Sequence, residues 1–251
     1  HYIKEGKTEL DEGSINEGTE VIQHGDKYYL TFSPLGYGSR KYAVRQAVGD
    51  SPLGPFEKLG KDYNPVMGVN DTNDYMAGTG HHSFIKAGDE LFILYHAFYN
   101  PINNNPNGSF LGRAIGADRA QFMYNETLGY DILYGNGPTY SLQPLPDVAT
   151  GKTNVAKKAT IVTDGDSNTA KYLNDGLFTV QDFTAEWEYN APNTKNTGTT
   201  ITLKWEKPVR ISSFIIYNSQ SYYYAFDKVD SVVFKLAEKP SWYTASEYNG
   251  Y

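Results

Sequence analysis

Apolar residues in the first half of the chain occur in short runs that either alternate with polar residues or are continuously apolar. Glycine, asparagine and proline separate these runs, and no long stretch has the 3.6-residue apolar spacing of a helix. Short apolar or alternating runs bounded by such residues are typical of strands. The pattern therefore predicts an all-β first half, with strands over residues 28–32, 42–48, 91–98 and 131–134.

One pattern of ten residues occurs twice. Residues 21–30 match residues 84–93 position by position at an offset of 63, and each copy reads as a strand, a Gly-Asp turn and a second strand. A hairpin that recurs at a fixed interval favours a radial array such as a β-propeller, although typical blade repeats are shorter, at about 40–50 residues. Because Gly-Asp hairpins are common in β proteins, a chance match is the alternative.

The same offset aligns the residues that precede each hairpin, with 17–19 opposite 80–82. In a propeller the innermost strands line a central channel, so we expect the carboxylate of Glu17 and the imidazole of His81 to face one cavity. Closed propellers have about 4–8 blades, whereas the first 148 residues contain little more than two such units. Since open blade edges are prone to aggregation, we expect an N-terminal half or a companion chain to complete the ring.

The composition agrees with an all-β fold and argues against several classes of function. The 251 residues include 24 glycines, 12 prolines, 22 tyrosines, 12 phenylalanines and 3 tryptophans, which is typical of strands and turns. A net charge of −7 argues against nucleic-acid binding, and no apolar run approaches the about 18 residues of a membrane span. The absence of cysteine excludes disulfides, thiolate catalysis and cysteine-bound zinc. His1 in place of a starting methionine indicates an internal or processed end.

Charge and proline content divide the chain near residue 148. There are 11 basic and 18 acidic residues before this point and 11 of each after it, and residues 137–151 are rich in proline, as expected for a linker. We therefore expect two domains, 1–148 and 149–251. In the second domain, Trp205 is expected to share one face of a strand with Ile201 and Leu203 and to lie in the core. Alternating stretches predict a β-sandwich with strands at 154–156, 159–162, 172–177, 201–205 and 211–217.

Short motifs follow one another along the first domain in a fixed order. They are Asn-Glu-Gly-Thr-Glu-Val-Ile at 16–22, Tyr-Ala-Val at 42–44, Asp-Ser-Pro-Leu-Gly-Pro-Phe at 50–56, Gly-Thr-Gly-His-His-Ser-Phe at 78–84, Leu-Tyr-His-Ala at 94–97, Arg113, and Gly-Pro-Thr at 137–139. This series resembles glycoside hydrolase family 43. The resemblance implies a five-bladed β-propeller of which residues 1–148 form the C-terminal blades. Thr19 stands where the family motif has proline.

The same resemblance implies roles for four residues. The family uses an aspartate base, a second aspartate that tunes the acid, and a glutamate acid; only the acid is recognisable here, as Glu17. In an inverting enzyme the acid gives its proton to the leaving oxygen, while a carboxylate about 6.5–9.5 Å away activates water. His81 is similar to an axial histidine that contacts a calcium or sodium ion or its waters. Arg113 resembles an arginine that reaches sugar hydroxyls, and Tyr37 is a candidate for stacking on a sugar.

Each of these residues also has a structural interpretation. Glu17 would then be a solvated loop carboxylate, His81 a packed histidine, Arg113 half of a strand-end ion pair and Tyr37 a loop aromatic.

The remaining histidines are expected to have no direct role. His82 and His96 are weaker candidates than His81; His96, beside Tyr95 and Phe98, is expected to be structural, and His24, beside a turn, to be solvated. The asparagine-rich loop 100–108 is expected to project from the propeller rim.

The second domain resembles the discoidin, or coagulation factor five/eight type C, β-sandwich, a module that binds carbohydrate. The chain is shorter than that module, so the sandwich is expected to be incomplete. Trp187 and the tyrosines at 222–224 are candidates for stacking on sugar, with the tyrosines the better surface candidates. A spacer function is the alternative. Residues 174–176 read as a turn.

Together, the residues and the resemblance predict an extracellular or cell-surface bacterial glycosidase. It would be similar to α-L-arabinofuranosidases and β-xylosidases and act on polysaccharide or oligosaccharide that contains arabinose or xylose. No organic cofactor is expected. The 251 residues alone are not expected to be active, because the aspartate base would come from sequence or a chain not present here. The competing hypothesis is a carbohydrate-binding surface protein that has lost catalytic activity.

Overall fold

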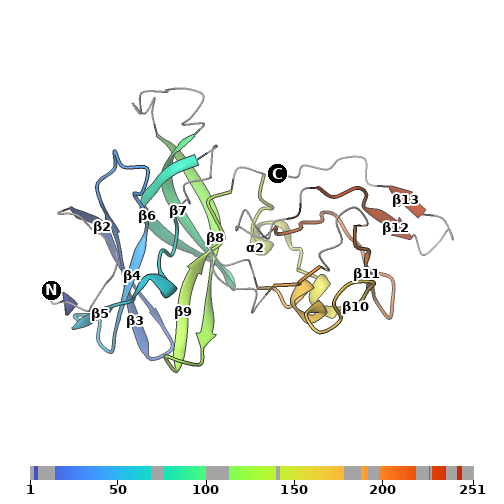
Figure 1. Ribbon diagram of the computed structural model, residues 1–251, viewed down its shortest axis with the longest axis horizontal. Helices are drawn as coiled ribbons and strands as arrows, with labels where there is room; N and C mark the ends of the chain where they lie inside the picture. Colours follow the sequence, from blue (N-terminus) through green and yellow to red (C-terminus); the bar gives the residue numbers. More distant parts are fainter. Residues whose placement is uncertain are drawn as a thin grey trace. The chain divides into compact units, whose positions relative to one another are not determined.

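The chain forms two compact units, which divide between residues 140 and 141 (Figure 1). The computed structural model describes residues 3–4, 15–68, 76–99, 113–139, 142–177, 188–191, 198–218, 226, 228–235 and 242–244. The first unit contains two β-sheets.

The first sheet has the strand order β1-β5-β4-β3-β2. Its strands pair antiparallel, except for β1, which pairs parallel with β5. A 3₁₀ turn, η1 (Lys61–Tyr63), follows the sheet. The strand bounds are β1 (Ile3–Lys4), β2 (Asn16–His24), β3 (Lys27–Pro34), β4 (Arg45–Gly49) and β5 (Phe56–Lys58).

The second sheet is an antiparallel meander in the order β6-β7-β8-β9. Its strands are β6 (Met76–Ala87), β7 (Glu90–Tyr99), β8 (Ala114–Asn125) and β9 (Tyr130–Gly135). The apolar pattern did not predict β8, because this strand mixes buried Asp118 and Arg119 with exposed Ile115 and Tyr124 and so lacks a clear alternation. Backbone pairing on both sides holds it in the sheet.

The repeated hairpin is confirmed. In each copy the two strands close over a Gly-Asp turn, with His24 opposite Lys27 in the first and Ala87 opposite Glu90 in the second. The four stretches predicted as strands at 28–32, 42–48, 91–98 and 131–134 fall on β3, β4 with the residues just before it, β7 and β9. The local pattern was sufficient here because a two-residue turn fixes the register of both strands.

The two sheets of this unit are joined by buried polar contacts as well as apolar packing. Gln46 on β4 is fully buried, and its side-chain amide donates to the carbonyl of Leu133 on β9 at 2.9 Å, while its side-chain oxygen accepts the Leu133 N–H. The hydroxyl of Tyr29 donates to the carbonyl of Asp131 at 2.5 Å. Since a buried polar group without a partner is costly, these pairs favour one arrangement of the two sheets.

The second unit consists of short elements. Strand β10 (Thr160–Thr163) pairs with β11 (Ile201–Lys204), and β12 (Val233–Lys235) pairs with β13 (Trp242–Thr244). The single-turn elements are α2 (Asp147–Thr150), η2 (Ala156–Lys158) and η3 (Ala170–Leu173).

Part of the sandwich prediction is wrong. The strands predicted at 159–162 and 201–205 correspond to β10 and β11, but the stretch at 154–156 runs into a 3₁₀ turn, 172–177 is a 3₁₀ end and turn, and 211–217 is not a strand. Ile201 is exposed and Trp205 is half-buried, with its indole N–H donating to the Val155 carbonyl. A two-stranded ribbon has no opposing layer within the described residues, so it cannot bury a complete face. Trp187 and residues 222–224 lie outside the described residues.

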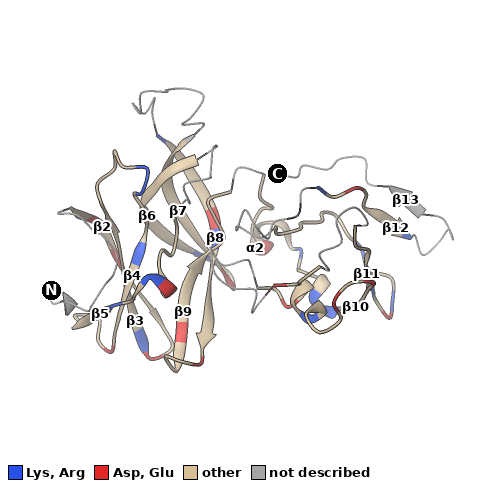
Figure 2. Cartoon of the chain, viewed as in Figure 1, with Lys and Arg blue, Asp and Glu red and all other residues tan. Residues whose placement is uncertain are grey.

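Charged side chains are spread over the strands of the described chain. No described strand carries more than one lysine or arginine, and Figure 2 shows acidic residues on β2, β8 and β9. No helix among the described residues is long and apolar enough to cross a membrane.

Candidate active site

Two backbone bulges bring Glu17 and His81 next to each other. The pairing of β2 with β3 is interrupted between Glu17 and Glu20, and that of β6 with β7 between Gly80 and Ser83, at positions related by the 63-residue offset. Bulges of this kind often redirect a side chain beside a functional site.

The turning points of the bulges are in contact. Gly18 and His81, again one offset apart, both have left-handed backbone, with φ of 59° and 48°. A Cβ on Gly18 would lie 3.0 Å from the Cα of His81, and the His81 N–H donates to the Ser33 hydroxyl at 2.9 Å. The repeat thus predicted a real correspondence in the structure, and glycine at position 18 permits the close approach.

Glu17 is held by a buried tyrosine. The hydroxyl of Tyr42 donates to Oε1 of Glu17 at 2.9 Å. Burial, followed by the bond to Glu17, raises the pKa of Tyr42 well above its usual value, so the hydroxyl keeps its proton. Gly80 makes room for the ring, because a Cβ there would lie 2.4 Å from Cε1 of Tyr42.

Tyr42 also connects Glu17 to an arginine. Its ring stacks on His96, with centroids 5.3 Å apart, and Nε2 of His96 lies 3.1 Å from Nη1 of Arg113. A guanidinium only donates, so His96 accepts at Nε2 and its proton belongs on Nδ1. Burial and the positive charge of Arg113 lower the pKa of His96 to about 4, which keeps the ring neutral near pH 7. The guanidinium carbon of Arg113 lies 4.8 Å from the centroid of Tyr37.

The four residues singled out from the sequence therefore meet in one cluster. Glu17, His81 and Arg113 all lie close enough to His96 for their charges to influence its pKa, and the His81 and His96 rings are 6.5 Å apart. Tyr37 covers Arg113 and is 58% exposed, which leaves ring surface open to a ligand. We refer to these four residues together with Tyr42 and His96 as the Glu17 cluster.

Sequence reasoning missed the two residues at the middle of this cluster. Tyr42 was noted only as part of a motif, and His96 was expected to be structural because aromatic residues flank it. Both contacts join segments far apart in the chain, so no local pattern could indicate them. The paired motifs at 42–44 and 94–97 were the only available signal.

A second glutamate on β2 has a different environment. Oε2 of Glu20 accepts the backbone N–H of Phe84 at 3.0 Å, which ties β2 to β6. Burial raises the pKa of Glu20, and the Phe84 bond acts in the opposite direction. Its carboxylate therefore has a backbone partner, whereas Glu17 is bonded to Tyr42 within the cluster.

The other two histidines that the structure describes lie outside the cluster. His82 is buried, with Nε2 2.6 Å from the Thr31 hydroxyl, and burial lowers its pKa to about 4. His24, expected to be solvated, is so only in part: its ring stacks on Phe122 with centroids 3.8 Å apart, and Nε2 lies 2.7 Å from Oδ2 of Asp131. The side chain keeps 40% of its exposure. Strand β8 supplies Phe122, which is why the turn sequence alone was misleading.

A cation is expected beside His81, and the described side chains around it show whether they could bind one. Among the described parts of the chain, no group of three or more histidine, aspartate or glutamate side chains could hold a metal ion. These residues alone therefore do not form a cation site around His81, and no step of the chemistry is assigned to one. The loop 100–108, expected at the propeller rim, lies outside the described residues.

Comparison with known proteins identifies the family. Residues 2–128, about half of the chain, match the model of glycosyl hydrolases family 43. The chain therefore belongs to glycosyl hydrolase family 43. A comparison with curated proteins gives no match.

Several solved structures are similar to part of the chain. A thermostable family-43 glycoside hydrolase is 34% identical, with 52% of this chain and 38% of that chain covered and a TM-score of 0.42. An endo-1,4-beta-xylanase from Bacteroides thetaiotaomicron is 24% identical, with 52% and 40% covered and a TM-score of 0.40. An alpha-L-arabinofuranosidase from Lactobacillus brevis is 22% identical, with 51% and 39% covered and a TM-score of 0.36. The chain thus spans about 40% of the length of these proteins.

Proposed function

We propose that this chain carries the general-acid side of an inverting glycosidase that cleaves arabinose- or xylose-containing saccharides. Glu17 is the acid. The observation that carries the proposal is the hydrogen bond from buried Tyr42 to Oε1 of Glu17, within a cluster that also contains Arg113 and the exposed ring of Tyr37. Family membership supplies the reaction class.

The bond from Tyr42 determines which carboxyl oxygen can act. Oε1 accepts from the tyrosine, so the acidic proton of Glu17 is placed on Oε2. As the glycosidic bond breaks, Oε2 gives this proton to the leaving oxygen, and the negative charge that develops on the carboxylate is stabilised by the Tyr42 hydroxyl. Such a bond becomes stronger in the transition state, which is the condition for accelerating the chemical step.

Arg113 and Tyr37 are suited to hold the sugar. One guanidinium nitrogen is engaged by His96, and the guanidinium has further N–H donors that can bind sugar hydroxyls. The neutral state of His96 avoids a second positive charge beside the guanidinium. The Tyr37 ring offers an apolar face on which a sugar can stack.

A second carboxylate is required on the opposite side of the sugar. It takes a proton from water while the water oxygen bonds to the anomeric carbon, and it would lie about 6.5–9.5 Å from Glu17. We propose that this aspartate, and the aspartate that tunes the acid, lie in an N-terminal half or companion chain that completes the five-bladed propeller. A calcium or sodium ion beside His81 on the propeller axis is part of the same proposal.

The second unit and the location of the protein follow from the resemblance. We assign the second unit a discoidin-like, carbohydrate-binding function, with the tyrosines at 222–224 as its candidate contact. An enzyme with such an appendage acts on polysaccharide outside the cell, which favours the exterior or surface of a bacterium.

A binding protein without catalytic activity is the second candidate. The observation that favours it is the exposed Tyr37 ring over Arg113, because a stacking face beside a guanidinium suits sugar binding whether or not cleavage follows. On this hypothesis the Glu17 cluster would bind a saccharide and leave it intact.

The test compares two glutamates of the same strand. The protein is purified from its own cells through a tag on this chain, so that any companion polypeptide is retained, and is assayed with aryl arabinosides and xylosides. Alkyl arabinosides and xylosides are assayed beside the aryl ones, and on these, whose leaving oxygen needs a proton, Glu17→Gln is expected to lower kcat by about 10²–10⁴-fold, the usual contribution of general acid catalysis. Glu20→Gln, which alters the carboxylate bonded to Phe84, is expected to retain most of the activity.

Three results would decide against the proposal. Equal activity of Glu17→Gln and the unmodified protein on the alkyl glycosides would exclude Glu17 as the acid. Equal losses in both variants would indicate a general effect on the strand. An assembly that contains both aspartates but cleaves no glycoside would favour the binding protein.

A further inference from the structure

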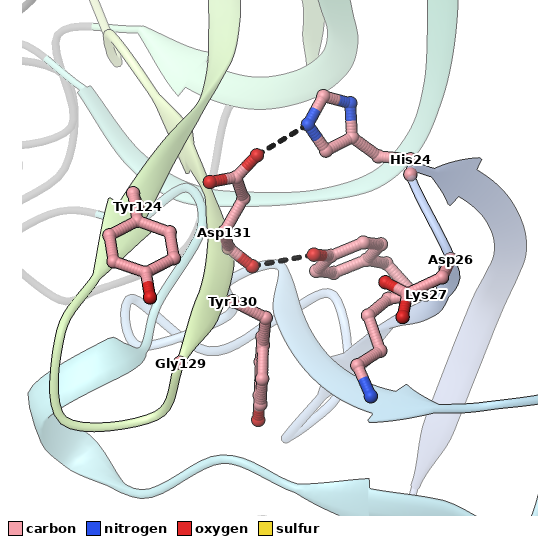
Figure 3. Close-up of a pocket in the computed structure, with 9 residues that line it drawn as sticks. His24, Asp26, Lys27, Tyr124, Gly129, Tyr130 and Asp131 are labelled. Carbon is pink, nitrogen blue, oxygen red and sulfur yellow. Dashed lines mark hydrogen bonds and ion pairs between the residues drawn. The ribbon is translucent and has the colours of Figure 1, made fainter.

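A cavity lies at the end of β2 opposite to Glu17. It has a volume of about 220 Å³ and is formed by the turn between β2 and β3 together with the turn between β8 and β9 (Figure 3). Glu17 and His24 stand near the two ends of β2. At about 3.3 Å per residue, the cavity is roughly 20 Å from the Glu17 cluster and cannot be part of it.

Two walls of different chemistry face each other across this cavity. Figure 3 shows the ring of Tyr124 on one side and the side chains of Asp26 and Lys27 on the other, with the Tyr130 ring between them, its centroid 5.4 Å from the Lys27 ammonium. Tyr124 is 60% exposed, so much of its ring is open to a ligand. An aromatic face opposite hydrogen-bonding groups is the arrangement by which proteins hold the apolar face and the hydroxyls of a sugar.

The charges around the cavity are largely balanced within the protein. His24 pairs with Asp131 at 2.7 Å, and Lys27 pairs with Asp50 at 2.6 Å. Tyr29 donates to the carbonyl of Asp131, and this bond together with the stacking of His24 on Phe122 holds the floor of the cavity in place. A ligand therefore needs no net charge, but it meets several oriented donors and acceptors. This favours a neutral polyol over an anion or a cation.

The volume limits the size of the bound group. Pockets for drug-sized ligands are about 300–1,000 Å³, so 220 Å³ has room for one sugar ring with the rest of an oligosaccharide outside. We infer that this cavity is a second saccharide-binding site, which holds one sugar unit of a neutral chain between Tyr124 and the Asp26–Lys27 turn. The choice of arabinose- or xylose-containing chains rests on the proposed function.

Hydrogen exchange can locate such binding independently of catalysis. The assembly with Glu17→Gln, which leaves the ligand uncleaved, is mixed with xylotriose or arabinotriose at up to about 10 mM, since contacts with one sugar are expected to be weak. Free xylose and arabinose form parallel arms that separate a chain ligand from a monosaccharide. Mass spectrometry then measures amide protection separately for the two cavity segments, residues 24–31 and 124–131, and for residues 15–20 beside the Glu17 cluster. We expect protection of the first two segments by at least one trisaccharide.

Three substitutions identify the tyrosine wall. Tyr124→Ala is expected to weaken binding at this cavity about tenfold, while Tyr124→Phe, which keeps the ring face, stays within about twofold. Ile115→Ala changes a residue of the same strand that is 79% exposed and outside the cavity, and it is expected to have no effect. All three substitutions are made at exposed positions, so the fold is retained.

The outcomes separate this inference from the proposed function. Protection of 24–31 and 124–131 that is lost in Tyr124→Ala supports the second site, even if the unmodified assembly cleaves nothing and the glycosidase proposal fails. Cleavage of xylosides or arabinosides without protection of these segments overturns the second site and leaves the glycosidase. Protection that is unchanged in Tyr124→Ala also overturns it.

Discussion

Removing one hydroxyl tests how the Glu17 cluster works. In Tyr42→Phe the ring still packs against Gly80 and His96, while the 2.9 Å bond to Oε1 of Glu17 is lost together with the hydroxyl's bond to Ser33. A hydrogen bond to a charged group contributes about 1.5–3 kcal/mol. Since each 1.36 kcal/mol changes a rate tenfold, kcat is expected to fall by roughly 10- to 100-fold. KM is expected to change little, because the charge on Glu17 develops only as the glycosidic bond breaks.

Steady-state kinetics of the native assembly with a xyloside or arabinoside measures both constants. Tyr95→Phe is a matched control, because Tyr95 also donates a buried bond to a carboxylate, at 2.6 Å to Oδ2 of Asp118, outside the cluster. It is expected to lower stability while kcat is retained. If kcat of Tyr42→Phe stays within about twofold of the unmodified value, the hydroxyl does not stabilise the acid and the reasoning fails.

Three further predictions concern stability and protonation. Gly18→Ala introduces left-handed backbone strain and a contact of 3.0 Å with the Cα of His81, so urea unfolding is expected to show a free energy of unfolding lower by about 2–3 kcal/mol. Gly25→Ala, at a positive φ but in open space, is expected to lower it by only about 1 kcal/mol. Equal losses in the two variants would contradict the close approach of Gly18 to His81. Burial raises the pKa of Asp118 to about 6, so its neutral form favours folding below about pH 4 and this contribution is lost as the pH rises through 6. The stability of Asp118→Asn relative to the unmodified chain is therefore expected to rise as the pH increases across this range. A difference in unfolding free energy that does not change with pH would show that the pKa of Asp118 is not raised. The pKa of His82 is lowered to about 4, so NMR titration should find the ring half-protonated near that pH, with stability lost as the pH falls from about 6.5; titration near 6.5 would show that the ring is not buried.

The parts of the fold that depend on neighbouring residues could be predicted from the sequence. The Gly-Asp hairpins at 21–30 and 84–93 were found because turn and strands are adjacent in the chain. Their common offset also predicted that segments 17–19 and 80–82, which contain Glu17 and His81, enter equivalent strands, and the structure places a bulge in each.

Features that depend on distant segments could not be predicted in this way. Strand β8 carries buried charged residues whose partners lie on other strands, so its pattern is not that of a half-buried strand. The cluster joins Tyr42 from the loop before β4, His96 on β7 and Arg113 before β8, and none of these contacts leaves a local signal. The second unit was predicted as a sandwich because alternation indicates strands but not whether a second layer covers them.

The leaving-group dependence of Glu17→Gln tests the central claim most directly. Kinetics of the native assembly are measured over a series of aryl and alkyl xylosides or arabinosides whose leaving groups differ in acidity. Because a general acid matters only when the leaving oxygen needs a proton, the loss in kcat/KM should be small for acidic phenols and rise toward about 10²–10⁴-fold for alcohols. A loss of the same factor across the whole series, or no loss at all, would show that Glu17 does not protonate the leaving group.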